Sequence, residues 1–210
     1  MSSHVTAAAA SAWEGGASPY ATNSKKFGMW LFIISDALTF SALLFAYTYS
    51  RVSNPDWPKP FDFFPSIIFS SVMTFCLLSS SLTMVMAVHA MYHGNRKSAV
   101  KWILATMVGG AAFVVLHATE WLRLINQEHV TAWSNPWGVP QFGATFFAIT
   151  GLHMTHVIIG VIYLGIICQA VGRGKFKAED VEVSGLYWHF VDLVWMFVFP
   201  LVYLMSARVA

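Results

Sequence analysis

Residues 184–206 read SGLYWHFVDLVWMFVFPLVYLMS, and this stretch decides the fold. It is apolar and long enough to cross a membrane, for which about 20 residues suffice. Yet it carries His189 and Asp192 in its first half. A charged side chain at the centre of a bilayer costs about 2.5–3.5 kcal/mol on insertion scales. Such groups therefore have to be covered by other helices, by lipid head groups or by a partner protein.

The rest of the chain has the same character. Of its 210 residues, 57% are hydrophobic and only 10% are charged, whereas soluble domains contain about 25% charged residues. The net charge of +2 is too small to indicate nucleic acid as a partner. We therefore predict an all-α, polytopic membrane protein, a bundle of five transmembrane helices. The expected spans are residues 27–49, 65–92, 99–124, 142–170 and 184–206.

Residues 1–24 are rich in Ala, Ser, Gly and Thr, with neither an apolar core nor a basic beginning. We expect a flexible polar tail there rather than a signal peptide, and a transmembrane domain over residues 25–210. Cys76 and Cys168 lie in apolar stretches and neither has a CxxC neighbour. This argues against an iron–sulfur or structural zinc site.

The connections between the spans predict the orientation. The prolines in residues 54–60 and 134–140 interrupt helices, residues 93–95 form a tight turn, and residues 172–183 are expected to be a polar loop. Basic residues collect on the cytoplasmic side of membrane proteins. With the N-terminus in the cytoplasm, eight of the twelve Lys and Arg residues lie inside. We therefore predict a cytoplasmic N-terminus.

Asp36 lies about 13 Å into the first span, close to the bilayer centre. Ser35 and Thr39 flank it and could donate hydrogen bonds to it. Two interpretations stay open. Asp36 is either a proton-related or partner-contacting acid, or a neutral hydrogen-bonded acid that fixes helix packing.

The third span carries His117, Glu120 and Arg123 at intervals of three residues, so that they share one face near the outer end. A triad that pairs internally would lower the cost of insertion. Alternatively, a lipid head group could lie against the same face.

His153 and His156 on the fourth span are also three residues apart and could share a metal with a ligand from another helix. Hydrogen-bonded core histidines are the simpler interpretation. Haem ligation is not expected, because no span carries the widely separated histidine pair of a transmembrane cytochrome b.

On the fifth span, His189 and Asp192 are neighbours on one helix face. They suit either a proton relay or a neutral pair that shares its protons. Trp188 and Trp195 share a face and are interpreted as packing surface. No complete catalytic or metal set is visible, so the sequence favours a subunit of a larger membrane complex and also permits a small transporter.

Four stretches closely resemble subunit III of haem–copper terminal oxidases, in its five-helix form. They are FGMWLFIISD (27–36), HATEW (117–121), FFAITGLHMTHVIIG (146–160) and YWHFVDLVW (187–195). Asp36 matches the family's intramembrane acid, which is glutamate in many members. The positions of Glu120, His153, His156, His189 and Asp192 match the family as well.

The resemblance implies a non-catalytic subunit in a bacterial cytoplasmic membrane, docked on oxidase subunits I and II. No haem or copper is expected in this chain, because the partner subunits hold them. The family's subunit III holds structural phospholipids and supports proton uptake, so membrane lipids are expected partners. The complex reduces oxygen and pumps protons.

Many cytochrome c oxidase versions have two further helices before the stretch that begins at residue 27. In the family, the phospholipids lie in a cleft between groups of helices. In this chain, a cleft that needs those two further helices would be smaller or would be completed by another chain. Five-helix versions occur in quinol oxidases and in some cytochrome c oxidases. Cytochrome c is the favoured electron donor to the complex, and quinol is the alternative.

Overall fold

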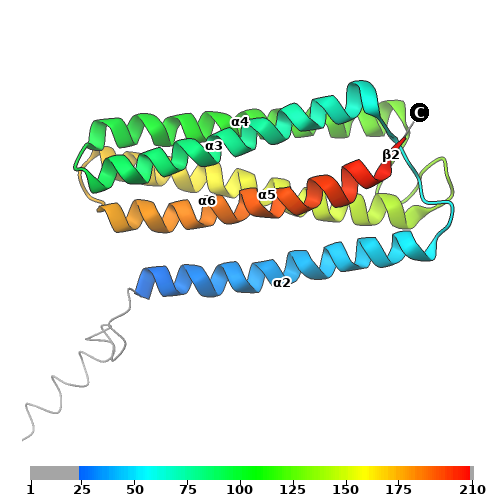
Figure 1. The fold of residues 1–210 in the computed structure, drawn as a ribbon, viewed down its shortest axis with the longest axis horizontal. Coiled ribbons are helices and arrows are strands. Elements are labelled where there is room, and N and C mark those ends of the chain that lie inside the picture. Colours follow the sequence, from blue (N-terminus) through cyan, green and yellow to red (C-terminus); the bar gives the residue numbers. More distant parts are fainter. Residues whose placement is uncertain (1–23, 209–210) are drawn as a thin grey trace, which may run out of the picture.

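A computed structural model describes residues 24–208, and these are largely helical (Figure 1). The expectations for the tail fall almost wholly on residues 1–23, which lie outside the described residues. Within the described residues, five helical segments are long and apolar enough to cross a membrane, which confirms the predicted spans. They are α2 (Ser24–Ser53), η1 (Phe63–Ile67) with α3 (Ile68–Tyr92), α4 (Arg96–Gln127), α5 (Pro140–Gly172), and α6 (Ala178–Val198) with η2 (Phe199–Tyr203) and η3 (Leu204–Ser206).

The start of the last helix corrects one expectation. Residues 172–183 were expected to be a polar loop, but α6 already begins at Ala178. Asp180 accepts a hydrogen bond from the backbone N–H of Lys177 at 3.0 Å. Acidic residues in a first turn satisfy the free N–H groups of a helix and its positive end. The polar residues from Ala178 onward therefore form the start of a helix and do not belong to the loop.

The helices α3, α4, α5 and α6 form a four-membered bundle in which each helix contacts the next and α6 returns to α3. Helix α2 lies against α5 and α6 on the outside of this bundle (Figure 1). Only 11% of the apolar window of α2 is buried, against 50% for α6. Helix α6 is therefore the central element and α2 the peripheral one.

Two tryptophans fix α6 against α3. The indole N–H of Trp188 donates to Ser80 at 3.1 Å, and that of Trp195 donates to Thr74 at 2.9 Å. Both rings are fully buried. They are thus packing surface, as expected from the sequence, with the hydrogen bond that a buried indole normally requires.

Gly110 makes room for one of these rings. A Cβ atom at this position would lie 2.4 Å from Cη2 of Trp188. Small residues allow membrane helices and bulky rings to approach closely. The glycine is therefore required here by packing and not by a turn.

The tight turn predicted at residues 93–95 joins α3 to α4. Gly94 has φ +73°, and the Asn95 side chain accepts a hydrogen bond from the backbone N–H of Ser98 at 3.1 Å. At the opposite end of the bundle, β1 (Phe61–Asp62) pairs in parallel with β2 (Ala207–Arg208). This pairing joins the segment before α3 to the end of the last span.

Candidate functional site

The intramembrane acid of α2 meets a histidine of α5. Oδ2 of Asp36 lies 3.1 Å from Nε2 of His156, although the contact is too poorly aligned to be a hydrogen bond. Nδ1 of His156 lies 2.8 Å from the carbonyl oxygen of Leu152. A carbonyl only accepts, so Nδ1 donates to Leu152, and Nε2 faces the carboxyl group of Asp36. The two side chains therefore meet across the interface between α2 and α5.

The neighbours expected for Asp36 do not bind it. Ser35 donates to the carbonyl of Phe32, and Thr39 donates to the carbonyl of Ser35. Hydroxyl groups inside helices commonly satisfy themselves in this way. The partner of Asp36 is thus across the helix interface and not on its own helix.

The histidines His153 and His117 lie in an aromatic cluster in the bundle core. The ring of His153 stacks on Trp195 with centroids 4.9 Å apart, and His117 lies 5.5 Å from the same indole. All four imidazole nitrogens are buried without a hydrogen-bond partner among residues 24–208. The expectation of hydrogen-bonded core histidines therefore holds for His156 but is wrong for His153.

A shared metal at the histidines of α5 does not fit this geometry. His153 faces Trp195, whereas His156 faces Asp36. Within the described part of the chain, no group of three or more His, Cys, Asp and Glu side chains converges in a way that could hold a metal ion.

Glu120 reaches from α4 to α3. Its Oε1 accepts a hydrogen bond from the hydroxyl of Ser70 at 2.6 Å, while its buried Oε2 has no hydrogen-bond partner among the described residues. Nε of Arg123 donates to Gln127 at 3.0 Å, and no ion pair between Arg123 and Glu120 is present within residues 24–208. Of the two interpretations left open, the structure does not show the internally paired triad, because the acid binds Ser70 of another helix.

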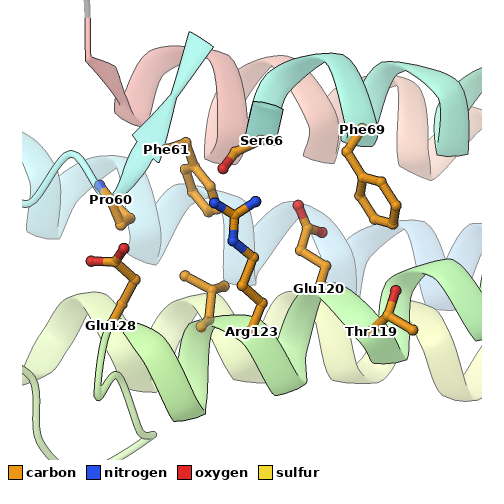
Figure 2. A pocket seen from close by; sticks show the side chains of 9 residues that line it. Pro60, Phe61, Ser66, Phe69, Thr119, Glu120, Arg123 and Glu128 are labelled. Atoms are coloured by element: carbon orange, nitrogen blue, oxygen red, sulfur yellow. The ribbon is translucent and has the colours of Figure 1, made fainter. Parts of the chain in front are cut away.

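A cavity of about 200 Å³ opens beside Glu120 and Arg123. Figure 2 shows the side chains of α4 pointing from one side toward Phe61 and Ser66 on the other. The wall of the cavity combines one cation, two acids, hydroxyl groups and apolar side chains. The lining residues are Pro60, Phe61, Ser66, Phe69, Thr119, Glu120, Arg123, Leu124 and Glu128.

His189 of α6 binds a serine of α3, while its neighbour Asp192 does not bind His189. The hydroxyl of Ser81 lies 2.6 Å from Nδ1 of His189. The described residues contain no direct ion pair between His189 and Asp192, so the expected pairing is not observed, and His189 binds Ser81 instead. Oδ1 of Asp192 is buried without a hydrogen-bond partner in this part of the chain.

Sequence reasoning missed the charged contacts that hold α2 at its N-terminal end. Lys25 pairs with Asp180 at 2.7 Å, and Lys26 pairs with Glu182 at 2.5 Å. Tyr92 of α3 also donates to Glu182 at 2.6 Å. The sequence does contain a signal for these contacts, because basic residues at the start of the first span and acidic residues before the fifth lie on the same side of the membrane.

These contacts define a class of protein: a polytopic membrane bundle whose intramembrane acids and imidazoles lie at interfaces between helices. Comparison with known proteins then identifies the family. The family described as Cytochrome c oxidase subunit III matches residues 5–207. The chain belongs to this family and is thus a subunit III of a haem–copper oxidase, which assembles with other oxidase subunits.

Relatives of two kinds are similar to this chain. Quinol oxidase subunit 3 of Bacillus spizizenii is 34% identical over 182 residues, covering 85% of this chain and 86% of the relative. Cytochrome c oxidase subunit 3 of Alkalihalophilus pseudofirmus is 33% identical over 187 residues, covering 87% of both. Cytochrome c oxidase subunit 3 of Scyliorhinus canicula is 30% identical over 205 residues, covering 91% of this chain and 73% of the relative.

Proposed function

We propose that this chain is an accessory subunit that stabilises the catalytic part of the oxidase and holds no redox centre of its own. One observation carries this proposal: the intramembrane acids join helices to one another. Asp36 of α2 contacts His156 of α5, and Glu120 of α4 accepts from Ser70 of α3. Groups used in this way support a structural role. Haem and copper then belong to partner subunits I and II.

A second part of the proposal concerns phospholipid. The cavity beside Glu120 supports it, because Arg123 stands there next to apolar walls formed by Phe61 and Phe69. A guanidinium group suits a phosphate, and the apolar walls suit acyl chains. The contact of Asp36 with His156 inside the membrane supports the proposed assistance to proton uptake in the catalytic subunit.

The proposed electron donor to the complex is cytochrome c, in keeping with the description of the matching family. Quinol is the second candidate, since a quinol oxidase subunit 3 is among the most similar relatives. The proposed location is the bacterial cytoplasmic membrane, with the N-terminus inside. Oxygen consumption by the purified complex, measured with reduced cytochrome c and separately with a quinol, distinguishes the two donors.

The accessory role is tested by preparing the oxidase with and without this chain. The haem spectrum should be unchanged, while the number of turnovers before inactivation should fall when the chain is missing. A haem spectrum from this chain alone would overturn the proposal. Mass measurement of the intact complex should also find retained phospholipid, and fewer lipids should remain after Arg123→Ala than after Lys59→Ala, a control outside the cavity.

A further inference from the structure

Two histidines lie side by side at the end of α3. His89 is in the last turn of the helix, and His93 is its C-terminal cap, with φ −90° and ψ 11°. Residues four apart on a helix lie on the same face, and the two imidazole rings have centroids 4.2 Å apart. Both residues are exposed. The turn that follows them lies at the end of the bundle where α2 begins (Figure 1), so the pair is at the rim of the membrane-spanning part.

The ring of His93 is held in the tautomer that a metal ligand needs. Its Nδ1 lies 2.9 Å from the carbonyl oxygen of His89. A carbonyl only accepts, so Nδ1 donates and Nε2 keeps its lone pair. Metal-bound histidines normally donate their other ring nitrogen to a carbonyl or a carboxylate in this way. His89 itself lines an open groove of about 340 Å³ between α3 and α6, so its ring can be reached from outside.

The surroundings of the pair favour a cation. The C-terminus of a helix carries about half an elementary negative charge, and the carboxylate of Glu182 lines the same groove as His89. Its oxygens already bind Lys26 and Tyr92 at 2.5 and 2.6 Å, so Glu182 is not counted as a ligand. The guanidinium group of Arg96, which begins α4, lies against the turn that follows α5.

The other histidines considered above do not offer a comparable site. His117 and His153 are buried in the aromatic cluster, and His156 faces Asp36. His129 is exposed, but it lies in the connection between α4 and α5, at the opposite end of the bundle from the pair. His129 is therefore the matched control for an exposed imidazole outside the pair.

We propose that His89 and His93 together bind a divalent transition-metal ion of the class of Zn²⁺, Cu²⁺ and Ni²⁺, with water in the remaining positions. Imidazole suits these ions, whereas Mg²⁺ and Ca²⁺ prefer oxygen ligands. Two histidines four residues apart on one helix face are also the spacing of the HExxH zinc motif. Because no group of three His, Cys, Asp or Glu side chains converges within residues 24–208, the ion is held by two side chains and exchanges with solution. This inference goes beyond the proposed function and does not depend on it.

The test is a titration of Zn²⁺ into the assembled oxidase after washing with a chelator, with bound ions counted by equilibrium dialysis. The unaltered complex should bind one Zn²⁺ more than the double variant His89→Ala/His93→Ala. Either single substitution leaves one imidazole and should weaken this site by about 100-fold, in keeping with the gain from linking two binding groups. His129→Ala should leave the binding unchanged, and an excess of Mg²⁺ should not displace the ion.

Equal Zn²⁺ binding by the unaltered complex and the double variant would overturn the inference. An equal loss in His129→Ala would overturn it too, because any exposed histidine would then account for the binding. His93→Cys supplies a thiolate, which is another zinc ligand, and should bind more tightly than His93→Ala.

A measurement on the unaltered complex covers the case in which a variant fails to assemble. Zn²⁺ should protect both His89 and His93, but not His129, from modification by diethyl pyrocarbonate, as read by mass spectrometry. Equal modification of His89 and His93 with and without Zn²⁺ would overturn the inference. The proposed accessory role would survive that result, because it is tested by turnover of the oxidase with and without this chain.

Discussion

Replacing Asp36 separates the effect of its charge from that of its hydrogen-bonding shape. In Asp36→Asn the amide can donate to Nε2 of His156, which is a bare acceptor because Nδ1 donates to Leu152. The contact between α2 and α5 is then retained, and we expect a loss below about 1 kcal/mol. In Asp36→Leu the imidazole nitrogen loses its partner in a site where only 12% of the His156 side chain is exposed.

The cost of leaving such a nitrogen unpartnered is about 1–3 kcal/mol. This corresponds to a docking equilibrium of α2 that is weaker by about five- to 150-fold. The effect should be visible because α2 buries only Ile33, Phe40 and Tyr47 against the bundle. Few other contacts therefore compensate for the lost one.

The assay is a thermal ramp of the purified oxidase, with the fraction of this subunit retained in the complex as the readout. Asp36→Asn should follow the unaltered protein, and Asp36→Leu should release the subunit at lower temperature. Adding His156→Leu to Asp36→Leu should cost little more, because the orphaned nitrogen disappears. Equal damage from the Asn and Leu variants would refute this reasoning, since the charge itself would then be what holds α2.

Three other substitutions test the packing and the ion pairs. Trp195→Phe removes the hydrogen bond to Thr74 and should cost about 1 kcal/mol, whereas Trp195→Ala should cost about 3–5 kcal/mol; unfolding in denaturing detergent measures both. Gly110→Ala should lower the melting temperature of the subunit, because its Cβ would clash with the ring of Trp188; an unchanged melting temperature would contradict the close approach. Lys26→Ala removes a partly exposed ion pair and should cost less than about 1 kcal/mol, with a smaller effect at high salt in a salt titration of stability.

The spans were predictable because apolar length is a local property of the chain. All five lie where the sequence places them. The start of α6 was missed because residues 178–183 are polar. Polarity alone does not separate a loop from a first helical turn, where acids are favoured.

The positions of the intramembrane polar groups were also predictable, but their partners were not. Spacing along one helix suggested that Asp36 would meet Ser35 or Thr39 and that His189 would meet Asp192. The structure joins Asp36 to His156 and His189 to Ser81 instead. A sequence shows which residues share a helix face, but the neighbour across that face depends on how the helices are rotated and paired.

The hydroxyl partners Ser70 and Ser81 gave no signal. Many serines and threonines in these helices donate to a carbonyl of their own helix, as Thr48 and Ser79 do. Nothing local marks the few that also bind a carboxylate or an imidazole of another helix. Tyr203, buried next to Glu120, was missed because its neighbour lies on another helix.

The two indole groups that bind Ser80 and Thr74 restrict the movement of α6 relative to α3. Sliding α6 by one turn, about 5.4 Å, along α3 would break both hydrogen bonds at once and displace two large rings from their buried positions. We therefore expect these two helices to move together. A force that acts on this subunit during turnover would then tilt α3 and α6 together or displace α2, the least buried helix.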